Sequence, residues 1–385
     1  MSRKWEEAFS LLRYIELLGY EAYIVGGAVR DYLLNKEEKD IDVVMNATVK
    51  EIMRLFPKAK QPSAAFPMVL VPWKSLFVEV SPYREGTKTL EEDLACRDFT
   101  INALALKENG TIIDPYGGKN DLQHRILRSI DPSKRFQEDP LRILRLFRFA
   151  GELSFHIEKK TMTTACQLQH LLSSVAVERI QQELDRLLQA KDHERVFHLM
   201  TKHHLFMAFP VELQPERPLP PTLCWNFHML VTPAERWAAF LWNLYGRNAN
   251  KKWPHWRFSK KMTRSLSYFF QAIQQQESLS WDDVELYDIG IERVLQIERF
   301  HQWVYDNKDD EKLRKVAKVY RQLPIQSRQD LRVNGKDVLT LFPKIERKKV
   351  GWILREVEKA VLRKEVKNKE EELVSYVKGK LRYEG

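Results

Sequence analysis

Two aspartates, Asp40 and Asp42, lie one residue apart in the run DIDVV (40–44), which is otherwise as apolar as a buried strand. Side chains alternate along a strand, so both carboxylates lie on one face of it. Two carboxylates at this spacing can bind a hard cation such as Mg²⁺, with water and phosphate oxygens completing its shell. Exposed strands also carry such pairs by chance. The pair alone therefore leaves a metal site and a solvated strand face open.

A glycine pair lies fourteen residues upstream of Asp40, in VGGAVRDYLL (25–34). Gly26 and Gly27 follow an apolar run and begin an amphipathic segment, as an ordinary strand–helix turn also would. Glycine lets backbone N–H groups approach a phosphate closely, and a helix N-terminus favours an anion. Arg30, in the first helical turn, can reach the same anion. The order strand, glycines, helix, second strand predicts a phosphate site beside a metal site.

A third carboxylate, Glu79, lies in the alternating run LFVEVS (76–81), where its neighbours Val78 and Val80 face the other way. The simpler interpretation is the polar face of a half-exposed strand. If this strand lies beside the DIDVV strand, three carboxylates converge on a two-metal site for attack on a nucleotide α-phosphate.

Asp139 and Arg142 are three residues apart in DPLRILRLFRFAGEL (139–153), which has helical periodicity, so we expect them on one helix face. Aspartate accepts hydrogen bonds and arginine only donates them. Cytosine and adenine present an amine beside an acceptor, whereas uracil and guanine present a carbonyl there. The pair can therefore select CTP and ATP. Arg145 and Arg148 extend this face towards a triphosphate; without the other motifs, a helix with solvated arginines is the simpler interpretation.

The elements that must position these residues are of two kinds. Residues 1 to about 125 mix helical segments with strand-like runs. These runs are YIVGG, DIDVVM, MVLVPW, LFVEVS, ALALK and GTIIDP. From about Asp131 onward the pattern is helical with almost no strand signal, as in VERIQQELDRLLQ (177–189). We predict an α+β multidomain protein, with a mixed α/β head followed by all-α segments.

The chain has 385 residues and a formal net charge of +10. Residues 311–385 hold 21 Lys/Arg and 11 Asp/Glu, so the excess lies in this region. A basic region beside a neutral body indicates a polyanion partner, although a solvated helical surface would have the same composition. No run is long enough for a membrane span, and the beginning lacks a signal-peptide apolar block. The scattered Cys96, Cys166 and Cys224 suggest neither disulfides nor a zinc site and favour a cytoplasmic protein.

Five motifs occur in the order found in class II tRNA nucleotidyltransferases, the family of CCA-adding enzymes and bacterial poly(A) polymerases, and they resemble that family along the whole chain. The motifs are GGAVRD with DID, RDFTINALAL (97–106), DPYGG (114–118), EDPLRILRLFRFAGEL (138–153) and VERIQQEL (177–184). The resemblance implies Mg²⁺ held by Asp40 and Asp42, with Glu79 helping to activate the attacking hydroxyl. It also implies contacts from Arg97, Asp98 and Asn102 to ribose and phosphate, and a tRNA lacking its 3′ CCA end as partner.

The resemblance also implies four segments. They are a nucleotidyltransferase-type catalytic head (1–130), a nucleotide-selecting helical neck (131–195), a helical body (196–310) and a basic helical tail (311–385) that contacts tRNA. A proline-rich stretch at 209–221 marks a loop or boundary. The tryptophans that follow have the spacing of helix packing, and we assign them no function.

The sequence departs from the family pattern at two places. Cys96 replaces the first of two arginines that usually precede the aspartate of the second motif, which removes one positive charge. Between Arg84 and Arg97 the chain has only EGTKTLEEDLAC, roughly a dozen residues fewer than the flexible loop typical of enzymes that add the full CCA. That loop is thought to reshape the pocket from C to A.

We therefore predict a CC-adding enzyme that uses CTP and releases pyrophosphate. The alternatives are a full CCA-adding enzyme using CTP and ATP, a poly(A) polymerase, and a non-catalytic RNA-binding protein. The last would be expected to have lost a carboxylate, and none of the three is missing. A small-molecule nucleotidyltransferase is disfavoured by the long helical remainder and the basic tail.

Overall fold

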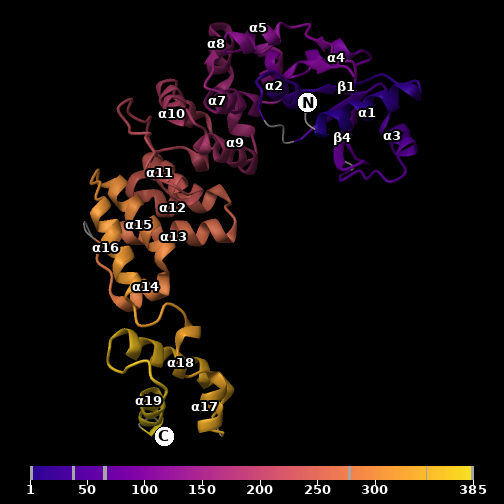
Figure 1. Cartoon of the computed structure of the whole chain (residues 1–385). Helices are drawn as coiled ribbons and strands as arrows, with labels where there is room; N and C mark the ends of the chain where they lie inside the picture. The colour runs from indigo at the N-terminus through magenta and orange to yellow at the C-terminus, as the bar shows by residue number, and fades with distance from the viewer. Residues whose placement is uncertain (1–2, 37–39, 64–66, 276–278, 344, 383–385) are drawn as a thin grey trace. The chain divides into compact units, whose positions relative to one another are not determined.

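The computed structural model describes residues 3–36, 40–63, 67–275, 279–343 and 345–382. The first residues of the expected head and the last of the expected tail lie outside these ranges. The chain divides into two compact units, Met1–Trp225 and Asn226–Gly385. In the described part of the chain, strands occur in the first unit, drawn from indigo to magenta in Figure 1, and the second unit is helical.

The strand-like runs form one mixed sheet in the order β3-β4-β2-β1-β5-β6. Strands β2 and β4 are parallel, and the other neighbouring strands are antiparallel. The strands are β1 (Ala22–Val25), β2 (Asp42–Met45), β3 (Val69–Trp73), β4 (Leu76–Pro82), β5 (Ala105–Leu106) and β6 (Ile112–Ile113). Each coincides with a predicted strand-like run to within one residue, with β1 beginning one residue before its run and β4 ending one residue after, which confirms the mixed α/β head.

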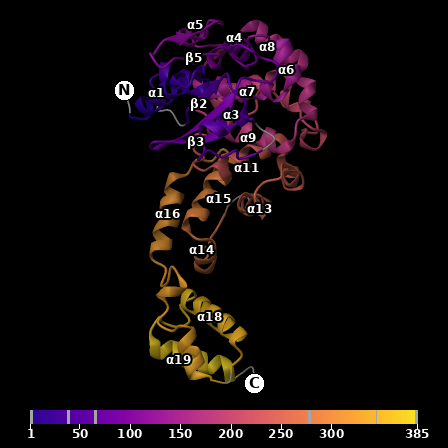
Figure 2. The same cartoon turned by 90° about the vertical axis from the view of Figure 1, so that its right-hand side faces the viewer.

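Alternation along the strands buries one face of the sheet, whereas the other face is covered at β1 and β2 and exposed along β4, where Phe77 and Glu79 lie. Ile24, Val43 and Val80 occupy one register row and are fully buried. Val25 and Val44 belong to the other face and pack with leucines of α4 (Leu90–Ala95). Helices α1 (Arg3–Leu17) and α3 (Val49–Leu55) both contact β4 (Figure 1), and α3 also contacts β3, beside which Figure 2 shows it. Asp42 begins β2 on the same face as Val44, so the fold places this carboxylate at the edge of an apolar layer.

Helices make up most of the rest of the first unit, and α7 packs against α9 and α10. Their bounds are α2 (Gly27–Leu33), α5 (Gly118–Gln123), α6 (Pro132–Glu138), α7 (Leu141–Leu153), α8 (Lys159–Leu168), α9 (Val177–Gln189) and α10 (His193–Lys202). A small parallel sheet joins β7 (Ile126–Leu127) to β8 (His156–Ile157). Strand β8 lies in the region expected to be helical, and two residues are too few to produce an alternating pattern.

The second unit is a set of helices with two apolar centres. Trp237 and Trp256 are fully buried with ring centroids 5.4 Å apart, as the helical spacing of the tryptophans predicts. A second cluster joins α14, α17, α18 and α19 through residues such as Leu286, Val338 and Leu373. The helices are α11 (Pro233–Tyr245), α12 (Ala249–Lys252), α13 (Lys260–Gln275), α14 (Asp283–Ile289), α15 (Ile291–Val304), α16 (Asp310–Arg321), α17 (Gly335–Leu341), α18 (Arg347–Leu362) and α19 (Glu370–Arg382). None of the helices described is both long and apolar enough to cross a bilayer.

Candidate active site

One cavity of the first unit, about 780 Å³ in volume, brings together all but one of the residues predicted to form the site. Glu79 is the predicted residue that does not line it. The predicted residues that do are Gly26, Gly27, Arg30, Asp40, Asp42, Arg97, Asp98, Asn102, Asp139, Arg142, Arg145 and Arg148. The cavity therefore gathers residues that are up to about 120 positions apart in the sequence.

The glycine turn between β1 and α2 is shaped by a close approach of Arg97. Gly26 has φ 73°, which favours glycine, and its N–H donates to the carbonyl of Leu104 at 3.2 Å. A Cβ on Gly26 would lie 2.7 Å from Arg97 Nη1 and 3.9 Å from Asp42 Oδ2. The Gly26 N–H is thus already used within the fold, contrary to the expectation that it is free for phosphate. The glycine instead makes room for a guanidinium beside Asp42.

The carboxylates lie where β2 and β4 run side by side. Asp42 is opposite Glu79 in the parallel register, as expected if the two strands are neighbours, and Asp40 precedes β2 by two residues. Burial raises the pKa of Asp42, an effect that Arg97 opposes and Asp40 reinforces. Although Glu79 is exposed, surrounding protein removes part of the water around its carboxylate, and this raises its pKa, with further contributions from Asp42 and Asp40. Negative charge is therefore concentrated at this edge.

No group of three or more His, Cys, Asp or Glu side chains in the described part of the chain is arranged to hold a metal ion. Glu79 is exposed, and only Asp40 and Asp42 line the cavity. The three-carboxylate site therefore stays a prediction. The donor chemistry of the two aspartates nevertheless suits a hard cation, because carboxylate oxygens crowded together in a partly buried site are stabilised by positive charge.

The second motif forms a chain of polar contacts across the cavity wall. Arg30 Nη1 donates to Asn102 Oδ1 at 2.8 Å, and Asn102 Nδ2 donates to Asp98 Oδ1 at 2.9 Å. Arg145 pairs with Asp98 at 2.7 Å. Although burial opposes ionisation, Arg145, the hydrogen bond from Asn102 and Arg142 together hold the pKa of Asp98 below its usual value. Asp98 is therefore an anion that orients arginines around the cavity.

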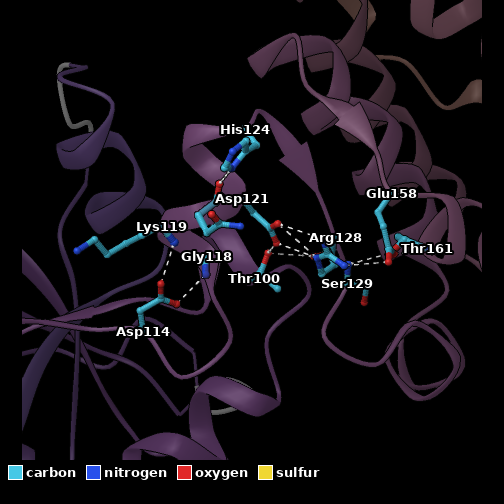
Figure 3. A network of polar contacts seen from close by, with 11 residues as sticks. Thr100, Asp114, Gly118, Lys119, Asp121, His124, Arg128, Ser129, Glu158 and Thr161 are labelled. Carbon is cyan, nitrogen blue, oxygen red and sulfur yellow. Dashed lines mark hydrogen bonds and ion pairs between the residues drawn. The ribbon is translucent and has the colours of Figure 1, made fainter.

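The third motif lies beside the second motif, and Figure 3 shows the polar contacts of this region. Asp114 accepts hydrogen bonds from the backbone N–H groups of Gly118 and Lys119, at 2.7 and 2.9 Å. A Cβ on Gly118 would lie 2.3 Å from the carbonyl oxygen of Thr100, so only glycine lets α5 approach the second motif this closely. The Thr100 hydroxyl donates to the buried Asp121 at 2.6 Å. The motif thus positions the second motif, and its residues do not line the cavity.

The fourth motif differs from the sequence expectation in its local structure. Asp139 and Arg142 do not share a helix: Asp139 has φ −145° and ψ 97° at the junction of α6 and α7, and α7 begins at Leu141. Pro140 explains the break, because the residue before a proline is driven away from helical geometry. Both side chains still line the cavity.

Asp139 and Arg142 each have a hydrogen-bond partner outside the fourth motif. Asp139 Oδ2 accepts from Arg179 Nη2 at 2.9 Å, which joins the fourth motif to α9 of the fifth. Arg142 Nη2 donates to the carbonyl oxygen of Cys96 at 3.3 Å. The pair is therefore oriented by contacts from two directions.

Arg145 and Arg148 differ in their surroundings. Arg145 remains 37% exposed beside Asp98, whereas Arg148 is 4% exposed and pairs with both Glu152 and Glu183. The Arg148 guanidinium also lies 3.9 Å from the centroid of the Phe149 ring. Arg148 is thus tied to α7 and α9, and a triphosphate would have to compete with two carboxylates for it.

Several residues of the cavity were missed by the sequence reasoning. Among the lining residues these include the basic side chains of Lys36, Arg84 and Arg186. Arg179 and Arg186 are seven residues apart on α9, and this helical spacing is a signal that could have revealed them. Arg84 follows the end of β4, where no local pattern indicates which way a side chain points.

Family models match most of the chain. One described as "Poly A polymerase head domain" matches residues 22–128, and one for tRNA nucleotidyltransferase domain 2 matches residues 229–377. Between them, "Probable RNA and SrmB- binding site of polymerase A" matches residues 154–213. A CCA-adding enzyme from Anoxybacillus flavithermus is 34% identical over 389 residues, covering 97% of this chain and 96% of that one. The chain belongs to the CCA-adding family of tRNA nucleotidyltransferases.

Two further members of the CCA-adding family are informative. The CC-adding tRNA nucleotidyltransferase of Halalkalibacterium halodurans is 35% identical over 374 residues, which cover 97% of each chain. The Bacillus stearothermophilus CCA-adding enzyme in complex with CTP has a TM-score of 0.81 and 30% identity, covering 100% of this chain and 99% of that one. Most of the named relatives are CCA-adding enzymes. Membership of this family makes the chain a nucleotidyltransferase of the tRNA 3′ end.

Proposed function

We propose that the chain transfers cytidine from CTP to a tRNA lacking its 3′ CCA end and stops after two cytidines. The observation that carries the chemistry is the meeting of the aspartates, the glycine turn and the Asp139–Arg142 pair around one cavity. The bond formed joins the RNA 3′ oxygen to the α-phosphorus, and the bond to pyrophosphate breaks.

The metal of this reaction is proposed to be Mg²⁺ held by Asp40 and Asp42, with Glu79 beside Asp42 as a further ligand or activator of the hydroxyl. When bound, the cation polarises the α-phosphate and lowers the pKa of the attacking hydroxyl. Gly27, Arg30, Arg97 and Arg145 are proposed to receive the triphosphate, because they line the same cavity as the carboxylates, and Gly26 is proposed to make room for the Arg97 guanidinium.

Base selection is proposed to rest on Asp139 and Arg142. A carboxylate offers about four acceptor sites, so Asp139 can accept from a cytosine amine while it keeps its bonds to Arg179 and the Leu141 N–H. Arg142 would donate to the O2 and N3 acceptors of cytosine. Uracil would place a carbonyl oxygen against the Asp139 carboxylate, and the two acceptors would repel.

Two observations support the proposal that nucleotide addition stops after two cytidines. The connection between β4 and α4 is short and closed by its own hydrogen bonds: Thr87 N–H donates to the Arg84 carbonyl at 3.0 Å, and Lys88 N–H donates to Glu92 at 2.6 Å. In addition, the alignment with the Anoxybacillus CCA-adding enzyme extends over 389 positions, which is more than the 385 residues of this chain. The alignment therefore contains gaps at which this chain lacks residues that the relative has. The match to the CC-adding enzyme needs only 374 positions.

Full CCA addition with CTP and ATP is the second candidate, because most named relatives are CCA-adding enzymes. Asp139 and Arg142 match the hydrogen-bonding edge of adenine as well as that of cytosine, so the pair itself does not exclude ATP. The two candidates share the cytidine steps and differ only in the final adenosine.

The tRNA partner is proposed to be held by charge in the second unit. Residues 311–385 carry the excess of lysine and arginine, and backbone contacts of this kind read RNA shape rather than sequence. In this proposal residues 1–130 form the catalytic head, 131–195 the nucleotide-selecting neck, 196–310 the body and 311–385 the tail.

The proposal is tested by offering radiolabelled CTP, ATP or UTP separately with Mg²⁺ to a tRNA ending before its CCA and to an unrelated RNA of equal length. We expect label only from CTP and only on the tRNA. Long A tails on both RNAs would indicate a poly(A) polymerase. RNA binding without incorporation of any nucleotide would indicate a non-catalytic protein.

A further inference from the structure

Asp93 of α4 is a buried carboxylate that contacts two arginines of the cavity wall. Its side chain is 1% exposed, and its Oδ1 accepts from the backbone N–H of Arg84 at 3.0 Å. Its Oδ2 lies 3.5 Å from Arg84 Nη1 and accepts from Arg97 Nη2 at 3.3 Å. Arg84 and Arg97 both line the cavity, and they lie at the two ends of the short connection that includes α4.

The carboxylate of Asp93 is not needed to cap its own helix. Thr89 and Glu92 form a capping box at the start of α4, with the Glu92 N–H donating to Thr89 Oγ1 at 3.3 Å. Among the described residues, the hydrogen bonds and ion pairs that Asp93 makes outside its own helix all lead to Arg84 and Arg97. Its burial is therefore explained by these two cations, since a buried carboxylate requires positive partners.

Arg97 has donors left over after this contact. Its side chain is 11% exposed, and its buried Nε has no hydrogen-bond partner within the described residues. Its Nη1 is the atom that lies over Gly26, close to Asp42. A guanidinium that lines the cavity, with one Nη anchored on Asp93 and the other over the glycine turn, is suited to bind a polyphosphate, because phosphate oxygens accept from several parallel N–H donors.

Without a counter-charge the arginines would not stay in this arrangement. Arg84 and Arg97 repel each other, and the carboxylate remaining beside Arg97 would be Asp42, the proposed metal ligand. A guanidinium paired with Asp42 would oppose the binding of a cation there. Asp93 thus supplies the negative charge that keeps Arg97 away from a full ion pair with Asp42.

We propose that Asp93 is a positioning residue that fixes Arg84 and Arg97 as the cationic contacts for the triphosphate of CTP and keeps Asp42 available for the metal. This inference rests on the proposed function and adds Arg84 as a nucleotide contact. The short connection after β4 thereby has a role in nucleotide binding, besides the effect that its shortness is proposed to have on the number of nucleotides added.

The test compares Asp93→Asn with wild type and with Glu7→Gln. Glu7 is also a buried carboxylate of the first unit, but its partners Ser75 and Arg3 lie outside the cavity. For Asp93→Asn we expect the KM for CTP and the Mg²⁺ concentration for half-maximal rate to rise roughly tenfold, the size of one lost charge-assisted contact. We expect kcat to change less, Asp93→Glu to recover part of the affinity, and Glu7→Gln to change neither KM nor the Mg²⁺ requirement.

Arg84→Gln provides a second test that does not depend on whether Asp93 variants fold. The Arg84 side chain is 43% exposed, so its replacement should not disturb folding. It should weaken CTP binding in calorimetry without lowering the thermal unfolding midpoint. In the Arg84→Gln, Arg97→Gln background, Asp93→Asn should cost little further CTP affinity, since contacting residues are not additive. Additive losses, or an unchanged KM in both Asp93→Asn and Arg84→Gln, would overturn the inference. Failure of wild type to extend tRNA would instead contradict the proposed function, while the CTP affinities would still decide the role of Asp93.

Discussion

Arg179, a residue of helix α9, donates a hydrogen bond to the carboxylate of Asp139 at 2.9 Å, across forty residues of sequence. Asp139 lies outside regular helix because Pro140 follows it, so its orientation depends on this contact rather than on a helix backbone. The residue proposed to read the base is thus aimed by a residue of another motif.

Replacing Arg179 with glutamine should therefore weaken base discrimination more than turnover. We expect the ratio of kcat/KM for CTP over UTP to fall roughly tenfold, the value of one charged hydrogen bond, with kcat for CTP reduced less. Arg13→Gln, at an exposed position of α1, is the matched control and should leave the ratio unchanged. An unaltered CTP-to-UTP ratio in the Arg179 variant would remove Arg179 from base selection.

Asp42→Asn should abolish nucleotide transfer while preserving tRNA binding. We expect incorporation of CTP to fall by about 10³-fold or more, because the proposed metal loses a charged ligand at the reacting phosphate. Filter binding of labelled tRNA should be nearly unchanged, since tRNA contact is assigned to residues far along the chain. Activity within tenfold of wild type would show that the metal is held elsewhere.

Asp42→Asn should stabilise the folded protein, although it removes activity. The pKa of Asp42 is raised by burial, so the folded state favours its protonated form, and its ionisation costs stability as pH rises through that pKa. Without metal, Asp42→Asn should therefore unfold at a higher temperature than wild type near neutral pH. The difference should vanish in acid below the ordinary carboxyl pKa, and a lower midpoint at neutral pH would contradict the assigned shift.

Gly26→Ala separates backbone strain from the placement of Arg97. Gly110 is a matched control because it also has positive φ, 83°, but a Cβ there meets nothing within 4 Å. Both alanine variants should lose about 1–2 kcal/mol of unfolding free energy through left-handed backbone strain. Only Gly26→Ala should also weaken CTP binding, because its methyl group would displace the Arg97 guanidinium. Equal CTP affinities in the two variants would mean that the position of Arg97 over Gly26 is unimportant.

Local patterns predict the strands and the long helices well, because alternation and helical spacing are properties of short segments. Val43 and Val80, for example, are buried on one sheet face as their alternation indicates, and α9 covers the same residues as the run VERIQQELDRLLQ. The expected neighbourhood of β2 and β4 is also present, although the DIDVV pattern gives no information about strand partners.

Contacts between distant segments are what the patterns miss. A helix pattern placed Asp139 on the face of Arg142, and Pro140 overrides that pattern locally. Helical spacing could indicate Arg179 as a position on one face of α9, but it could not reveal Asp139 as its partner, and no spacing indicates the contacts of Asp93 with Arg84 and Arg97, because each pair joins two elements. Glu79 was predicted to complete a three-carboxylate site, but one register position specifies only its strand neighbour and not how its side chain meets a metal.

The most direct measurement is the sequence of the tRNA 3′ end after incubation with Mg²⁺, CTP and ATP together. We expect wild type to leave tRNAs ending in CC, with no adenosine added even at high ATP, and Asp42→Asn to leave them unextended. Ends completed to CCA, or ends with no added cytidine, would contradict the proposal that this chain adds two cytidines and then stops.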